Sequence, residues 1–321
     1  MAELNNVVSG LGRMERRKAI QFAGGAVGWA ALGVGESKAA KEKFEIRYVL
    51  SSAMYGDLPL DEVLGEVEKA GAESVDIWRL RHANHREQIA EMGDEVFQDL
   101  LKKYGASMSI TSLYPLGPFK QDDEMRWVRK NGGHMTVCGS GRMGPPDPVG
   151  AEAKQQMKGF FEKLKPHYEL AEELGVTMAI ENHKNAALSS PDSIRYFVEL
   201  NPSKSVGIAF APHHLYDAVE DIPALIRDCG KENLPFIYFQ EHHLSSKQEM
   251  AKVQELKQMP GFGSLDYVPI LTALKEVQFD GLAEIFMHPT PRGTPILPTA
   301  ERITDVINLS RDYIDECFAK V

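Results

Sequence analysis

Short runs of β-branched and aromatic residues alternate with longer stretches of helical periodicity from Phe44 to the end of the chain. Eight such runs can be counted, and between them apolar residues recur at the three- and four-residue spacing of amphipathic helices. This alternation is typical of βα units around a parallel sheet. The expected strands are Ile46–Leu50, Ser74–Trp78, Ser107–Leu113, His134–Cys138, Thr177–Asn182, Val206–Phe210, Phe236–Glu241 and Leu282–Met287.

Glycines mark the points where several of the expected helices end. Gly71, Gly105 and Gly175 each follow an amphipathic stretch and precede an expected strand. Glycine most easily adopts the left-handed conformation that closes a helix. The repeated order of helix, glycine and strand predicts a single-domain (β/α)8 TIM barrel over residues 41–321.

The first forty residues carry a different pattern. Arg16-Arg17 precedes an apolar run rich in Gly and Ala, and Ser37-Lys38-Ala39 places small residues at cleavage-type positions. This order resembles a twin-arginine export signal, so we predict that residues 1–40 are removed and that the mature protein is periplasmic. A retained anchor is the alternative, although the run is short and glycine-rich for a spanning helix, so no stable membrane insertion is expected. Met14 is an alternative start to Met1.

Charge and motif content exclude several classes of function. The formal net charge is -10, which opposes binding to a phosphate backbone, so no nucleic-acid partner is expected. The cysteines Cys138, Cys229 and Cys317 show no CxxC spacing and are expected to be buried as small apolar residues. The chain has no GxSxG, Walker, HExxH or GxGxxG motif, so it lacks the signatures of serine hydrolases, P-loop proteins and NAD-dependent enzymes.

Most of the histidines gather near the ends of the last four expected strands, where a barrel brings side chains to one axis. Glu181 and Glu241 precede two of them, and Glu284 lies inside the last strand. Strand alternation predicts that only one histidine of each doublet faces inward. The six histidines are His183, His213, His214, His242, His243 and His288; by contrast, His82, His85 and His167 are expected to be surface or packing residues.

Three segments resemble the xylose-isomerase-like barrels, which include sugar phosphate isomerases and epimerases. They are Met178–His183, Pro260–Tyr267 and Phe279–Gly281, and the resemblance spans roughly residues 44–318. The family usually holds a divalent metal with Glu, Asp, His and Glu from strands five to eight. By this resemblance Glu181 keeps the first position and His214 matches a substrate-contacting histidine. Ala211, Gln240 and Phe286 stand at the other three ligand positions, although a two-residue gap in strand eight would instead place Glu284 at the last of them.

Four histidines lie two residues beyond the family's ligand positions and should therefore still face the axis. They predict a displaced site for a divalent transition metal such as Mn, Zn, Fe or Ni. Hydrogen bonding of the same imidazoles to sugar hydroxyls, without a metal, is the alternative. The predicted ligands are His183, His213, His242 and His288, with Glu181.

The resemblance implies an isomerase or epimerase that moves a proton next to the carbonyl of a sugar or keto-sugar derivative. Glu181 or Glu284 would be the base, with His214 also in a catalytic role. A keto-sugar lyase or hydrolase and a non-catalytic carbohydrate-binding barrel are the alternatives. A homo-oligomer is compatible with the sequence. The residues expected to bind the sugar are Trp78, Arg79, Tyr114, Gln240 and Arg142.

Overall fold

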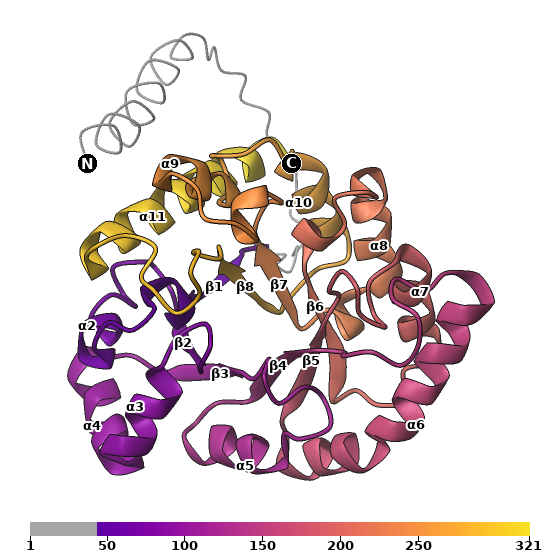
Figure 1. Ribbon diagram of the computed structural model, residues 1–321, viewed down its shortest axis with the longest axis horizontal. Coiled ribbons are helices and arrows are strands. Elements are labelled where there is room, and N and C mark those ends of the chain that lie inside the picture. Colours follow the sequence, from indigo (N-terminus) through magenta and orange to yellow (C-terminus); the bar gives the residue numbers. More distant parts are fainter. Residues whose placement is uncertain (1–43) are drawn as a thin grey trace, which may run out of the picture. The chain divides into compact units, whose positions relative to one another are not determined.

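Eight parallel strands form a closed barrel in which each strand pairs with its neighbours in sequence and β1 pairs with β8 (Figure 1). The computed structural model describes residues 44–321, so the predicted export signal lies outside the described residues. The predicted TIM barrel fold is confirmed. The strands are β1 (Arg47–Ser51), β2 (Ser74–Trp78), β3 (Met108–Ser112), β4 (Met135–Gly139), β5 (Thr177–Glu181), β6 (Val206–Phe210), β7 (Phe236–Phe239) and β8 (Leu282–Ile285).

Helices surround the barrel on its outside (Figure 1). Gly105 and Gly175 follow α4 and α6 in the left-handed conformation, with φ of 62° and 64°, as the glycine pattern predicts. Ser190 begins α7 with a capping box that includes Ser193. The α-helices are α2 (Leu60–Leu64), α3 (His85–Met92), α4 (Asp94–Tyr104), α5 (Asp122–Lys130), α6 (Gly150–Leu174), α7 (Pro191–Leu200), α8 (Ile222–Cys229), α9 (Lys252–Glu255), α10 (Tyr267–Glu276) and α11 (Ala300–Phe318).

The core lies between the strands and the helices and inside the barrel. Every residue of β2, β6, β7 and β8 is buried, which explains the continuous apolar sequences of β6 and β7. The three cysteines are buried and free, as predicted. Among residues 44–321, no helix is both long enough and apolar enough to cross a membrane.

Two carboxyl groups lie inside the barrel despite this apolar setting. Asp76 and Glu284 both have no exposed surface, and Ser112 Oγ donates a 2.6 Å hydrogen bond to Asp76 Oδ2. Burial raises the pKa of Asp76 from 3.8 to about 7, while the hydrogen bond from Ser112 lowers it. Burial, and then the charge of Asp76, raises the pKa of Glu284 well above its usual range. We therefore expect Glu284 to keep its proton at neutral pH.

The variant Asp76→Asn is expected to be more stable than the wild type at pH 8 but not at pH 4. The folded-state pKa lies above the unfolded value, so the folded protein binds the extra proton and loses stability as the pH rises through about 7. The expected gain in the free energy of unfolding is on the order of 1–3 kcal/mol, measured by urea unfolding. Ser112→Ala removes the hydrogen bond to the Asp76 carboxylate and should therefore lower the free energy of unfolding at pH 8. The explanation is wrong if the free energy of unfolding depends on pH in the same way in the wild type and in Asp76→Asn.

Candidate functional site

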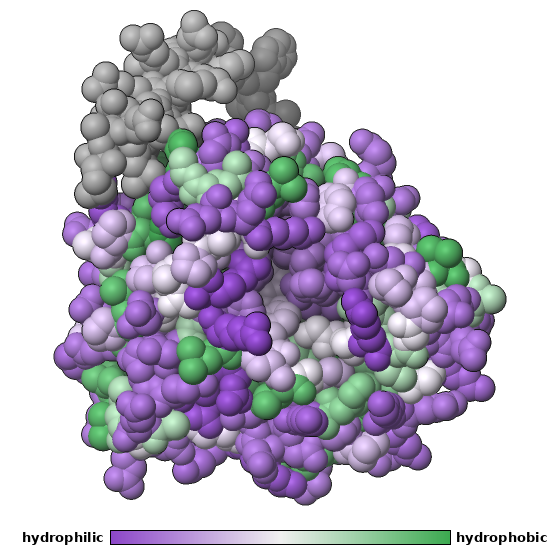
Figure 2. Space-filling view, in the orientation of Figure 1, coloured by the Kyte–Doolittle hydropathy of each residue, from purple (hydrophilic) through white to green (hydrophobic). Residues whose placement is uncertain are grey.

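A cavity of about 200 Å³ is lined by residues that follow β5, β6, β7 and β8. This is the face on which ligand sites of such barrels form. The face drawn in Figure 2 is hollowed near its centre, with hydrophilic residues around the hollow. The cavity lining contains five histidines, and it also contains three cationic side chains, Lys184, Lys247 and Arg292.

A larger cavity of about 750 Å³ is lined by residues of α2, α11 and the segments beside them. Its acidic residues include Asp61, Glu62 and Glu301, and none of its lining residues is a histidine. Glu66 in this lining is buried and already hydrogen-bonded to Thr304 and Lys69. The convergent, unpartnered groups therefore belong to the smaller cavity.

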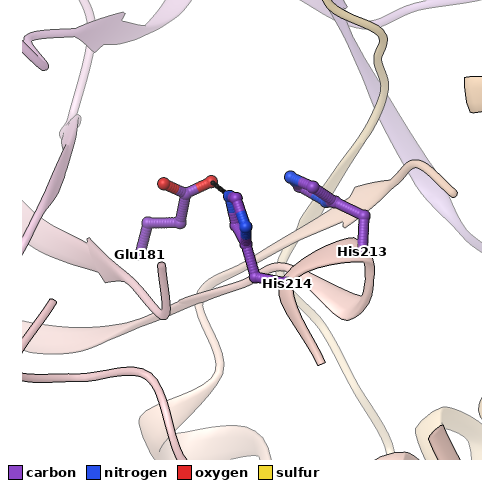
Figure 3. A group of neighbouring side chains, drawn as sticks. All are labelled: Glu181, His213 and His214. Carbon is purple, nitrogen blue, oxygen red and sulfur yellow. Dashed lines mark ion pairs between the residues drawn. The ribbon is translucent and has the colours of Figure 1, made fainter. Parts of the chain in front are cut away.

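Glu181, His213 and His214 form a cluster at the site (Figure 3): the two histidines line the cavity, and Glu181, which is not part of the lining, lies against them. One potential ligand atom from each lies within 4.8 Å of the others, and His214 Nε2 is 3.8 Å from Glu181 Oε1. Glu181 is 4% exposed and His213 is 6% exposed. Glu181 Oε2, both ring nitrogens of His213, and His214 Nε2 have no hydrogen-bond partner among the described residues. A buried polar cluster without partners is costly unless a ligand completes it.

The local fold explains why both histidines of this doublet reach the cluster. Glu181 is the last residue of β5, whereas His213 and His214 lie in a 3-10 turn, Pro212–His214, just after β6. The expectation that alternation turns one of them away is wrong here, because a 3-10 turn does not alternate its side chains. Asn182 ties the two strand ends together by donating to Ala211 O at 3.0 Å and accepting from Ala211 N at 2.7 Å.

The imidazoles at the site are expected to be neutral. The His183 and His214 rings are 3.9 Å apart, and the His213 and His214 rings are 4.1 Å apart. Burial, followed by the charges of neighbouring histidines, lowers the pKa of His213 and His214 well below the usual range. Burial also lowers the pKa of His183, whose Nδ1 is 2.7 Å from Lys184 O. Each neutral ring keeps a lone pair that can bind a metal or accept a hydrogen bond.

The donor set fits a divalent transition metal. Two neutral imidazoles and a carboxylate are ligands that Zn²⁺ and similar ions accept in three-residue catalytic sites. The unpartnered buried atoms of Glu181, His213 and His214 support this fit. The group is smaller than the predicted set, which allowed either His213 or His214: both take part with Glu181. His183 lies outside the group, with its ring centre 3.9 Å from that of His214.

The other two predicted ligands lie against aromatic rings. His242 is exposed and stacks on Tyr216, with ring centres 4.0 Å apart. His288 packs edge-on against Phe286 at 4.6 Å and lies 5.2 Å from the ring of His82. Both His242 and His288 line the cavity, so they remain available to a substrate even though they lie outside the Glu181 group.

A stack of three aromatic rings lies beside the site. Trp78 is 1% exposed and is sandwiched between Tyr114 at 5.2 Å and Phe286 at 5.0 Å. The Tyr114 and Tyr238 hydroxyl groups are 2.9 Å apart. Trp78 therefore supports the site from within the core, while the half-buried Tyr114 keeps some exposed surface. Phe286, at a family ligand position, completes this stack.

The remaining predicted sugar-binding residues hold contacts of their own. Arg79 lies 3.4 Å from Glu124 and 3.8 Å from Glu87, in ion pairs with α5 and α3. Gln240 lines the cavity and donates to Gln258 at 3.1 Å. Arg142 donates to the backbone oxygen of Asn185 at 3.3 Å. Glu284 lies inside the barrel and is not part of the cavity lining.

Sequence reasoning missed Lys247 and Arg292. His82, expected to be a surface or packing residue, packs its ring against those of Trp78, Tyr114 and His288. Lys247 and Arg292 lie in the loops after β7 and β8, where the sequence shows charge but not which charges lack a partner.

Comparison with known proteins places the fold in a family. The family model described as a xylose isomerase-like TIM barrel matches residues 64–305. A crystal structure of the IOLI protein with a bound zinc atom has a TM-score of 0.65 at 15% identity, covering 86% of this chain and 99% of that chain. L-ribulose 3-epimerase has a TM-score of 0.64 at 14% identity, covering 86% and 95%.

A third similar structure is 3-keto-D-glucoside 4-epimerase, YcjR, from E. coli, in its apo form. Its TM-score is 0.60 at 13% identity, covering 84% of this chain and 100% of that chain. No curated protein matches the chain by sequence. Since the family model covers most of the barrel, the chain belongs to the xylose isomerase-like TIM barrel family.

Proposed function

We propose that this protein is a sugar isomerase or epimerase that transfers a proton at a carbon next to a carbonyl group. The observation that carries this proposal is the buried Glu181 carboxylate, whose Oε2 lacks a hydrogen-bond partner among the described residues and which lies against His213 and His214. Burial raises the pKa of Glu181 to about 8, so its ionised form is a strong base for proton abstraction from carbon. Similarity to two sugar epimerases supports the substrate class.

Different side chains have different roles at this site. Glu181 Oε2 takes the proton from the carbon beside the carbonyl, which leaves an enediolate, and in an isomerisation it returns the proton to the adjacent carbon. The imidazole of His214 binds the substrate oxygen beside it. Glu181, His213 and His214 would also hold a divalent metal, which supplies Lewis-acid polarisation of the carbonyl oxygen when bound. The aromatic stack of Tyr114, Trp78 and Phe286 keeps water away from one side of the site.

Two alternatives use the same barrel differently. A keto-sugar lyase begins with the same proton abstraction but then loses a leaving group from the neighbouring carbon. A non-catalytic carbohydrate-binding barrel is favoured by one observation, the Phe286 ring packed on Trp78 at a position where the family usually has a carboxylate. Proton exchange separates catalysis from binding, because binding alone breaks no carbon–hydrogen bond.

Incubation of the protein with a panel of ketoses and keto-sugars in D₂O is expected to place deuterium on the carbon beside the carbonyl. Proton NMR would follow the loss of that signal, and the appearance of an unsaturated product would indicate the lyase instead. Glu181→Gln serves as the control because it keeps the shape of the side chain and removes the base. If exchange proceeds equally in the wild type and in Glu181→Gln, the site is not catalysing the reaction.

A further inference from the structure

The charges that line the cavity have the opposite sign to the protein as a whole. The chain carries a formal net charge of -10, yet Lys184, Lys247 and Arg292 all line the same 200 Å³ cavity. Lys184 is neutralised by Asp217 at 2.6 Å and Asp147 at 3.6 Å. Within residues 44–321, neither Lys247 nor Arg292 has a carboxylate within 4.0 Å. The cavity therefore keeps two positive charges without a carboxylate partner among the described residues, although the exposed Lys247 lies 5.7 Å from the centre of the Tyr216 ring.

Arg292 is held in place although its charge is not compensated. Its Nη2 donates to Ser246 O at 3.0 Å and its Nη1 donates to Pro289 O at 3.3 Å. These backbone contacts orient the guanidinium and leave other N–H groups free in the described part of the chain. Burial lowers the pKa of Arg292 to about 10, which reflects the cost of holding this charge away from water.

The carboxylate nearest to these cations in the cavity lining is directed elsewhere. Glu241 is 3% exposed, and its Oε2 accepts a hydrogen bond from Leu265 N at 2.8 Å. Burial raises the pKa of Glu241 to about 7, and backbone hydrogen bonds from the loop around Gly263 lower it. Glu241 therefore binds the backbone of the loop around Gly263 and does not neutralise Arg292 or Lys247.

The two cations lie in the same cavity as the imidazoles. Arg292 and Lys247 line it together with His183, His213 and His288. An anion bound in this cavity would therefore meet both positive charges and the imidazole rings beside them.

We infer that the site takes an anionic sugar derivative whose carboxylate or phosphate group is bound by Arg292 and Lys247. A guanidinium can bind either group through two parallel hydrogen bonds, and the lysine adds a second charge. The inference rests on the proposed function only for the sugar part of the ligand. The anion would restore the charge balance that the cavity lacks by itself.

Binding to matched pairs of sugars that differ only in charge tests this inference. The panel pairs hexuronates with their own amides and hexose phosphates with their own hexoses, titrated into the full chain by calorimetry. At least one anion is expected to bind roughly tenfold or more tightly than its neutral partner. The pair that shows the preference distinguishes a carboxylate ligand from a phosphate ligand, and the preference should weaken with added salt.

Charge-removing variants assign that preference to the two cations. Arg292→Gln and Lys247→Gln should each lose most of the preference, and Arg292→Lys should recover part of it. Lys257 is exposed and, like Lys247, lies between β7 and β8, but it is not part of the cavity lining. Lys257→Gln should therefore keep the full preference for the anion. The inference is overturned if no anion binds more tightly than its neutral partner, or if Arg292→Gln keeps the wild-type preference. If a neutral sugar exchanges its proton and no anion is preferred, the proposed reaction stands and only the anion site is ruled out.

Discussion

The variant Glu181→Gln is expected to lose turnover by about a thousandfold or more while the metal-free protein melts at the same or a higher temperature. The loss follows because the amide cannot accept a proton from carbon and is a poor metal ligand. Burial raises the pKa of Glu181 to about 8, so the folded protein loses stability as the pH rises through that value. Glutamine removes this penalty, and the gain should be largest above pH 8. Turnover and calorimetric melting measure the two effects.

Another buried glutamate provides the control for this substitution. Glu66 is 5% exposed and hydrogen-bonds to Thr304 and Lys69, in the cavity between α2 and α11. Glu66→Gln should keep turnover within a few-fold of the wild type. Turnover that survives in Glu181→Gln would show that this carboxylate is neither the base nor a necessary ligand.

The variant Trp78→Ala is expected to lower the free energy of unfolding by about 3–5 kcal/mol. Trp78 is almost fully buried and stacked between Tyr114 and Phe286, so truncation removes both stacking contacts and leaves a void. Urea unfolding measures the change. Trp78→Phe keeps an aromatic ring and should cost much less. A Trp78→Ala protein of normal stability that has lost sugar affinity would instead make Trp78 a binding platform.

Most of the barrel could be predicted from the sequence because strand and helix periodicity differ. The main errors lie at the carboxyl ends of β7 and β8, which the sequence extends to Glu241 and Met287. In the structure Glu241 N–H donates to Gln258 O in the following loop, and β8 ends at Ile285. The residues that follow both strands stay buried, and after β8 they are also apolar, at Phe286 and Met287, so the sequence does not mark where the strands end.

The candidate site was predicted less completely than the fold. The position of Glu181 at a strand end was enough to single it out, and the gathering of histidines indicated the face on which the candidate cavity lies. Alternation failed for His213 and His214 because they lie in a 3-10 turn. The contribution of Arg292 depends on backbone oxygens of Ser246 and Pro289, which local sequence patterns do not reveal.

The metal content of the purified protein decides whether Glu181, His213 and His214 form one metal-binding catalytic centre. Elemental analysis would follow equilibration of the full chain with zinc or manganese and removal of the excess. We expect about one equivalent of a divalent transition metal in the wild type and a large loss in the double variant His213→Ala, His214→Ala. A wild-type protein with less than about a tenth of an equivalent, or a double variant that retains its metal, would contradict this expectation.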